Sequence, residues 1–198
     1  MSARTRREKE KESMRGAILA AAIKIIADEG YEKLSMRKIA DAIDYTPTTI
    51  YSYYKDKAQI VDDIAMQIHN KIIADVEVTM AENKASPPDD QLRFAFKTFL
   101  YSMADCADMG SAVIKSRAET IFGPNDKENS GITILQEFLA YGQRVGVFRE
   151  LDDNISWMLI TALIGFGLNS IENQLHNNEN WPYLAEVFVD MLVRGLVQ

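Results

Sequence analysis

Apolar positions recur at helical spacing along almost the whole chain, most often three, four and seven residues apart. The alternation that is typical of a β-strand does not appear, nor does an internal repeat or a low-complexity tract. Segments rich in Gly, Pro, Asn and Asp interrupt the helical runs at residues 83–90, 108–110, 122–131 and 146–154. The pattern predicts an all-α fold of roughly nine helices.

A short helix with one apolar face is predicted at residues 36–43. Met36, Ile39 and Ala40 lie on this face, and the small side chain of Ala40 lets a second helix cross closely. Ser35 precedes the helix, and its hydroxyl can accept one of the free backbone N–H groups of the first turn. The residue types therefore indicate where this helix begins and which side it buries.

A tight turn and a second short helix are predicted next, with the helix at residues 47–54. Asp44 belongs to the few residue types besides glycine that tolerate the left-handed conformation of a sharp turn. Thr46 and Pro47 are typical of a helix start, because Thr can cap the helix and Pro loses no hydrogen bond at the first helical position.

The second helix has an apolar side and a hydroxyl-rich side. Ile50 and Tyr54 lie four residues apart and can pack inward. The outer arc then carries Thr48, Thr49, Tyr51, Ser52 and Tyr53. This arrangement is typical of a helix-turn-helix that reads the major groove of DNA, and an ordinary bundle corner with solvated hydroxyls is the alternative. The arc holds no Arg, Gln or Asn, so bidentate readout of guanine or adenine is not expected from this helix.

A long helix is predicted at residues 57–82. Asp56 can cap its first turn, and Gln59 follows three residues later in the spacing of a capping box. The helix is long enough to belong to two domains, which makes it a natural lever between them.

The run from Ile18 to Val61 resembles the N-terminal DNA-binding domain of the tetracycline-repressor (TetR) family. The resemblance rests on Gly30, Tyr31, Ser35, Ile39, Ala40, Thr46, Thr49, Ile50, Tyr51, Tyr53, Tyr54 and Lys57. Asp44 and Thr48 depart from the family pattern, which often has glycine at these two places. The first departure affects only strain in the turn, whereas the second adds a side chain to the groove-facing end of the reading helix.

The resemblance implies a DNA-binding domain at residues 1–57 and a ligand-binding and dimerisation domain at residues 58–198. It implies that base edges or the adjoining backbone are faced by Thr46, Pro47, Thr48, Thr49 and Tyr51, and that phosphates are contacted by Ser35, Arg37, Tyr53 and Lys57. A homodimer would place two reading helices on one side and bind a palindromic operator. Repression is the commoner mode of the family, with release by a small, mainly hydrophobic ligand.

The uncharged segment at residues 154–171 invites comparison with a membrane span. Its polar residues and its short, fully apolar centre favour a buried helix instead. By resemblance this is helix eight, which packs on its own core and on a partner subunit, and a core role within one chain is the alternative. The predicted dimer residues are Met158, Ala162, Gly165 and Asn169 on this helix and Phe188 and Met191 on the last one.

Candidate ligand-binding residues lie on the mainly apolar faces of the intervening helices. They are Phe99, Met103, Arg117, Phe138, Tyr141 and Trp157. Arg117 follows apolar residues and could pair an acidic group of a ligand, or equally Glu119, Glu137 or a helix end. For the Met and aromatic residues, plain core packing is the alternative.

Charge is distributed unevenly along the chain. Residues 1–60 hold twelve Lys and Arg against nine Asp and Glu, whereas the remainder holds ten against twenty, within a net charge of −7. The clearest basic cluster is Arg4, Arg6 and Arg7, which could form an arm reaching DNA, the first turns of helix one, or a solvated tail. The acidic remainder would repel DNA, so only one side of the molecule is expected to dock.

Composition excludes several other classes. One cysteine and two distant histidines offer no disulfide framework and no recognisable zinc spacing, so neither a metal nor a cofactor is expected. No glycine-rich phosphate loop, G-x-S-x-G elbow or H-E-x-x-H pair is present, so an enzyme is the least favoured class. A sequence-tolerant DNA or interaction module without a ligand is a further alternative. A cytoplasmic location is expected, because charges crowd the N-terminus where a signal peptide would need an apolar segment.

Overall fold

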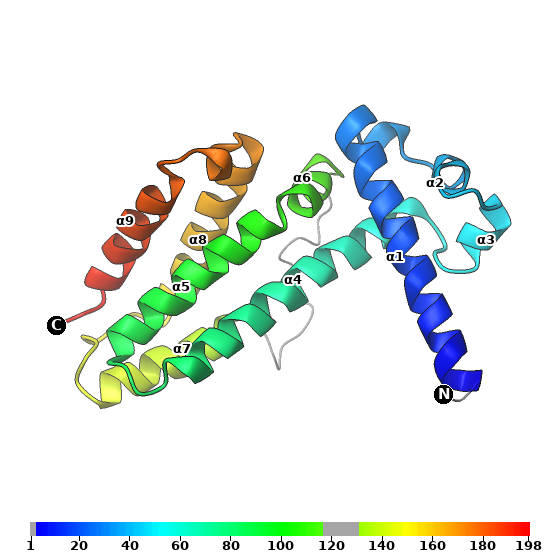
Figure 1. Cartoon of the computed structure of the whole chain (residues 1–198). Coiled ribbons are helices and arrows are strands. Elements are labelled where there is room, and N and C mark those ends of the chain that lie inside the picture. The colour runs from blue at the N-terminus through cyan, green and yellow to red at the C-terminus, as the bar shows by residue number, and fades with distance from the viewer. Residues whose placement is uncertain (1–2, 117–130) are drawn as a thin grey trace. The chain divides into compact units, whose positions relative to one another are not determined.

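The computed structural model of the chain describes residues 3–116 and 131–198, and this part is almost entirely helical (Figure 1). The all-α prediction is confirmed. Within the described residues the α-helices are α1 (Ala3–Glu29), α2 (Met36–Ala42), α3 (Pro47–Tyr51), α4 (Lys57–Glu82), α5 (Pro88–Asp105), α6 (Ala107–Ser116), α7 (Gly131–Arg144), α8 (Ile155–Glu172) and α9 (Trp181–Arg194). Two 3₁₀ turns are added, η1 (Tyr31–Lys33) and η2 (Leu175–Asn177).

Two compact units make up the chain. The first holds the residues up to Gln67 and a segment that begins at Asp108, and the second holds Ile68–Ala107 together with α7, α8 and α9. Helix α4 contributes residues to both units. The predicted functional domains, residues 1–57 and 58–198, divide at the start of α4, and that division stays a prediction.

The first unit is built on the apolar face of α1. Ile18, Leu19, Ala22 and Ile26 are buried, and α1 packs on α2 and η1. Gly30, with φ 89°, turns the chain out of α1 into η1, in a backbone region that glycine adopts without a steric cost. Helix α1 therefore ends at Glu29, immediately before this positive-φ glycine.

Helix α4 begins and ends where the sequence predicts. The carboxylate of Asp56 accepts the backbone N–H of Gln59 at 2.9 Å, and the side-chain oxygen of Gln59 accepts the backbone N–H of Lys55 at 2.9 Å. The first bond satisfies an N–H group of the first turn that has no partner inside the helix, and the second ties the residue before the cap to the same turn.

The core of the second unit forms where α5, α7, α8 and α9 meet. Helix α5 packs on α8 and α9, and α7 packs on α8. The buried side chains include Phe96, Leu100, Leu139, Phe148, Leu163, Trp181 and Val189. Gly142 and Gly167 allow the closest approaches, since a Cβ at these positions would lie 2.1 Å from the ring of Phe148 and 2.5 Å from the sulfur of Met103.

Helix α8 is the only helix of the described residues that is long and apolar enough to cross a membrane by length and composition. It packs in the second unit, with Leu159, Leu163 and Gly167 buried. The side chains of Trp157 and Met158 are 60% and 56% exposed on this chain. One side of α8 is therefore a core face, as predicted, and the other side is open.

Candidate nucleic-acid interface

The turn between α2 and α3 adopts the left-handed conformation that the sequence predicts. Asp44 has φ 59°, and the backbone N–H of Tyr45 reaches back to the carbonyl of Ala40 at 2.9 Å. Helix α2 itself starts as predicted, because the hydroxyl of Ser35 accepts the backbone N–H of Lys38 at 3.2 Å. It ends at Ala42, one residue before the predicted Ile43. These bonds fix the angle at which the chain enters α3.

The start of α3 is capped by a pair of threonines. The hydroxyl of Thr46 accepts the backbone N–H of Thr49 at 3.2 Å and lies 2.9 Å from the hydroxyl of Thr49. Pro47 follows at the first helical position. Both hydroxyls therefore stabilise the helix start, and a base edge would have to compete with this pair for them.

Helix α3 is shorter than predicted, ending at Tyr51 instead of Tyr54. The hydroxyl of Ser52 donates to the carbonyl of Thr49 at 2.6 Å, and the backbone N–H of Ser52 is shared between two carbonyls. Such side-chain bonds compete with regular helical pairing and tighten the last turn. Tyr54 still bonds to the carbonyl of Ile50, so the inward side chains keep the predicted helical spacing.

Ile50 and Tyr54 anchor α3 to its unit, as predicted. Their exposures are 0% and 1%. The phenol of Tyr54 donates to the carboxylate of Asp63 on α4, and the guanidinium of Arg15 on α1 lies 5.2 Å from the centre of its ring. Burial, and next the hydrogen bond to Asp63, raise the pKa of Tyr54 well above its usual range. The phenol therefore remains a neutral donor, and α3 is tied to both α1 and α4.

The opposite side of α3 is open to solvent. Tyr51 is 57% exposed, and Thr48 and Pro47 are exposed beside it. Thr49 and Tyr53 are half-buried. The structure thus brings the five predicted base-facing residues together at one short helix and its N-cap, where Thr46, Thr48 and Tyr51 are exposed and Thr49 is half-buried.

The predicted phosphate-binding residues differ in how firmly they are held. The side chain of Arg37 on α2 is 85% exposed and lies 4.0 Å from Asp41. The ammonium of Lys57, in contrast, donates to the backbone carbonyl of Tyr31 at 3.1 Å. It also lies 4.1 Å from the centre of the Tyr31 ring. Lys57 is therefore part of the structure of the unit as well as a candidate phosphate ligand.

The predicted ligand residues are dispersed in the second unit. Met103 is buried, and Phe99 and Phe138 are partly buried against the core. Tyr141 and Trp157 are 44% and 60% exposed on this chain, and their role in ligand binding stays a prediction. Their outward direction follows from their places on α7 and α8, where neighbouring residues fill the core. Arg117 lies outside the described residues.

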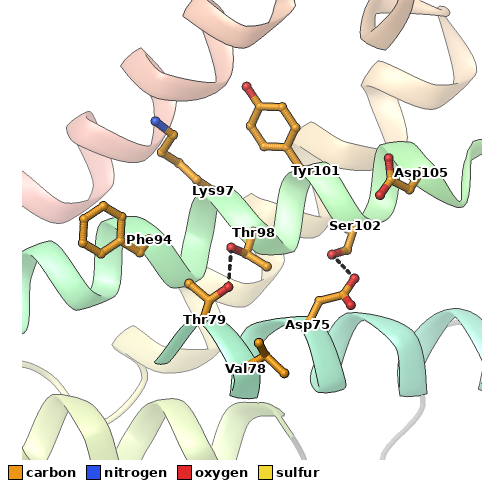
Figure 2. A pocket seen from close by; sticks show the side chains of 9 residues that line it. All are labelled: Asp75, Val78, Thr79, Phe94, Lys97, Thr98, Tyr101, Ser102 and Asp105. Carbon is orange, nitrogen blue, oxygen red and sulfur yellow. Dashed lines mark hydrogen bonds between the residues drawn. The ribbon is translucent and has the colours of Figure 1, made fainter. Parts of the chain in front are cut away.

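A groove that the sequence does not predict lies between α4 and α5 (Figure 2). Its volume is about 570 Å³. The lining residues are Asp75, Val78 and Thr79 on α4 and Phe94, Lys97, Thr98, Tyr101, Ser102 and Asp105 on α5. Each set follows helical spacing, but its mixed polarity is typical of a solvated helix face. Only the pairing of the two helices shows that they enclose a groove.

Polar contacts join the two walls of this groove (Figure 2). The hydroxyl of Ser102 donates to the carboxylate of Asp75 at 2.6 Å, and the hydroxyls of Thr79 and Thr98 lie 2.9 Å apart. The ammonium of Lys71 also donates to Asp75, at 2.6 Å. The bonds from Lys71 and Ser102 hold the pKa of Asp75 below its usual range, so this carboxylate is ionised at neutral pH.

The six predicted dimer residues lie on the open sides of α8 and α9. Met158 and Met191 are 56% and 61% exposed, and Gly165 and Asn169 are exposed as well. Ala162 and Phe188 are half-buried. The ring of Phe188 stacks on that of Phe166 with centroids 4.4 Å apart, which joins the two helices beneath this surface.

Other chemistry is sparse in the described ranges. Within residues 3–116 and 131–198, no three His, Cys, Asp or Glu side chains are placed to hold a metal ion. Cys106 is buried, and burial raises the pKa of its thiol. A buried thiol with a raised pKa is a poor nucleophile.

Comparisons with known proteins agree with the helix-turn-helix geometry. Residues 18–64 match the family model of the bacterial regulatory proteins, tetR family. An uncharacterized HTH-type transcriptional regulator of Haemophilus influenzae is 26% identical over 145 residues, which cover 72% of this chain and 74% of the relative.

Solved structures share the fold over nearly the whole chain. A TetR-family transcriptional regulator from Haemophilus influenzae is 20% identical with a TM-score of 0.68, and the match covers 96% of this chain and 99% of that one. The fatty acid degradation regulator FadR from Bacillus halodurans is also 20% identical, with a TM-score of 0.74 and coverage of 92% and 95%.

Proposed function

Because this chain is a DNA-binding transcriptional regulator of the TetR family, we propose that it binds a palindromic operator as a homodimer and represses transcription until a small, mainly hydrophobic ligand releases it. The observation that carries the proposal is the two-sided structure of α3. Ile50 and Tyr54 fix its inner side, while Thr48 and Tyr51 project into solvent. The protein would act in the cytoplasm, where its DNA lies.

Readout and affinity come from different groups in this proposal. The hydroxyl of Thr48 and the ring of Tyr51 would meet base edges or thymine methyl groups, which positions the helix and gives moderate preference. The exposed guanidinium of Arg37 would pair a phosphate, which adds affinity without sequence information. Thr46 and Thr49 would contribute mainly by holding the helix start.

The open sides of α8 and α9 support the homodimer. They expose large apolar side chains on both helices, namely Trp157, Met158, Tyr183, Leu184, Val187 and Met191. Gly165 stands on the same side of α8, and no atom lies within 4 Å of the position a Cβ would take there. Two copies could therefore bring these helices close together and bury the exposed surface in a four-helix interface. Two-fold symmetry then predicts operator half-sites about 34–36 Å apart, or a multiple of that distance.

Ligand control rests on the continuity of α4. This helix carries Ile60, Val61 and Ile64 in the first unit and lines the groove with Asp75, Val78 and Thr79 in the second. A ligand bound in the groove, or among Phe99, Met103 and Phe138, would act by favouring one setting of α4 over another. Its effect on DNA affinity must equal the effect of DNA on its own affinity.

The first experiment is the selection of bound duplexes from a random DNA pool. We expect the parent protein to enrich a palindrome, and Thr48→Ala/Tyr51→Ala to lose that enrichment because the variant lacks the exposed side chains of α3. Tyr141→Ala is the matched control, since it removes an exposed tyrosine from the other unit. Salt-sensitive binding without enrichment would instead support a sequence-tolerant module.

The enriched duplex then allows the ligand to be sought. Fatty acids are the first probes, because a similar fold belongs to the fatty acid degradation regulator FadR from Bacillus halodurans. We expect an inducer to lower operator affinity in a fluorescence anisotropy titration and to bind more weakly, by the same factor, when the operator is present. A compound whose affinity is the same with and without DNA is not an inducer.

A further inference from the structure

The N-terminal part of helix α1 extends well beyond the part that packs against the rest of the first unit. The helix begins at Ala3, whereas its first buried residue is Ile18, and residues 5–13 are all exposed. At 1.5 Å per residue, the exposed part is roughly 14 Å long. Figure 1 shows it as the dark blue end of α1, which continues straight past α2 and α3 with no other element of the unit beside it.

The exposed part carries a basic stripe in register with the buried face of α1. Arg7, Lys11 and Arg15 precede Ile18 by eleven, seven and three residues, which is the spacing of one helix face. Farther along α1, the same face packs on α2 and η1. The stripe is therefore directed to the side of α1 on which the helix-turn-helix lies.

The first two cations of the stripe have no acidic partner among the described residues. Arg6, which lies off the stripe, forms an ion pair with Glu10 at 2.9 Å. Within the described residues neither Arg7 nor Lys11 forms an ion pair. Arg7 and Lys11 are four residues apart, so their like charges oppose each other along the helix. Arg15, at the packed end, is held against the ring of Tyr54.

We propose that Arg7 and Lys11 contact the sugar–phosphate backbone of DNA beside the half-site that α3 reads. The inference rests on DNA binding by the helix-turn-helix. DNA is the occupant that the charges favour, because residues 5–15 hold five basic and three acidic side chains, whereas the chain as a whole has a net charge of −7. The stripe is also continuous with the face of α1 that packs beside the reading unit.

The length of the exposed helix sets how much DNA it reaches. On each strand the phosphates follow one another by about 3.4 Å of rise along the duplex axis, so roughly 14 Å of protein helix lying along that axis spans about four of them. Contacts of this kind add affinity and salt dependence and carry no sequence information. The operator footprint should therefore extend past the bases that α3 reads.

The test compares Arg7→Gln/Lys11→Gln with Arg6→Gln/Lys9→Gln, which changes the net charge equally but lies away from the stripe. Binding to the selected operator is measured from about 50 to 300 mM salt, on a long duplex and on one trimmed to the half-sites. For the stripe variant we expect affinity for the long duplex to fall about tenfold or more. The slope of log affinity against log salt should fall by about 3 to 4 for a dimer that loses four contacts. Affinity for the trimmed duplex should hardly change.

Several outcomes would overturn the proposal. Equal losses in both double variants would indicate general attraction by a solvated tail, and an unchanged stripe variant would show that the exposed helix does not touch DNA. An unchanged stripe variant that loses binding to an acidic protein would assign the stripe to that other class of partner. Failure of the DNA-binding function itself is recognised separately, because the parent protein would then enrich no duplex.

Discussion

At the residue scale, Asp44 shows how one backbone angle shapes the helix-turn-helix. Its φ of 59° lies where a β-branched side chain is strained and glycine is not. We expect Asp44→Val to lower the free energy of unfolding by about 1–2 kcal/mol, and Asp44→Gly to leave it unchanged or raise it by up to about 1 kcal/mol. Urea midpoints check this, with Asp28→Val at an exposed position of α1 as control. Equal effects of Val at both positions would contradict the strain argument.

A second prediction concerns the packing around Gly142. A Cβ there would lie 2.1 Å from a ring carbon of Phe148, whose side chain is only 1% exposed and has little space to move. We expect Gly142→Ala to cost about 1–3 kcal/mol of stability through overpacking. Gly16→Ala is the control, because nothing lies within 4 Å of its added methyl group and α1 gains up to about 1 kcal/mol in helix propensity. A Gly142→Ala protein as stable as the parent would show that the Phe148 ring can shift.

At the scale of elements, α4 and α5 are joined by polar contacts across the groove. Ser102→Ala removes one of the two hydrogen bonds to Asp75, and we expect a loss of about 1 kcal/mol at pH 7. The bond lowers the pKa of Asp75 in the folded state, so its contribution is present above the unfolded value near 3.8 and is lost as the pH falls further. Urea unfolding at pH 7 and at about pH 3 should therefore show the difference between parent and variant shrinking in acid. A difference that is equal at both values would assign the loss to packing alone.

At the scale of the whole molecule, the proposed homodimer joins two helix-turn-helix motifs. Gly165→Glu places a charged side chain in the middle of the open side of α8, where a second copy would have to bury it. We expect sedimentation to change from dimer to monomer at micromolar concentration, and operator affinity to fall by about 10²-fold or more because the half-sites are no longer bound together. Gln136→Glu, on an exposed position of α7, is the control. An unchanged dimer would remove this face from the interface.

Sequence reasoning predicts the local features of this protein well. The N-caps at Ser35, Thr46 and Asp56, the left-handed turn at Asp44 and the full extent of α4 all appear as expected. Each depends on interactions between residues only a few positions apart, and the preferences of those residue types are strong. The early end of α3 was missed because the hydroxyl of Ser52 competes for a carbonyl, which helix spacing alone does not reveal.

The sequence by itself determined the all-α fold and the helix-turn-helix, because these follow from periodicity, capping and short-range turn chemistry. The resemblance to the TetR family rests on matched residues instead. Only the tertiary structure decided which side chains remain exposed, as for Tyr141 and Trp157, and which groups meet across long stretches of chain, as for Lys57 with Tyr31 and Asp75 with Ser102. It also set the direction of the basic stripe on α1. The physical reason is that exposure and long-range pairing depend on which helix packs beside which, and a linear pattern gives only the face each helix buries.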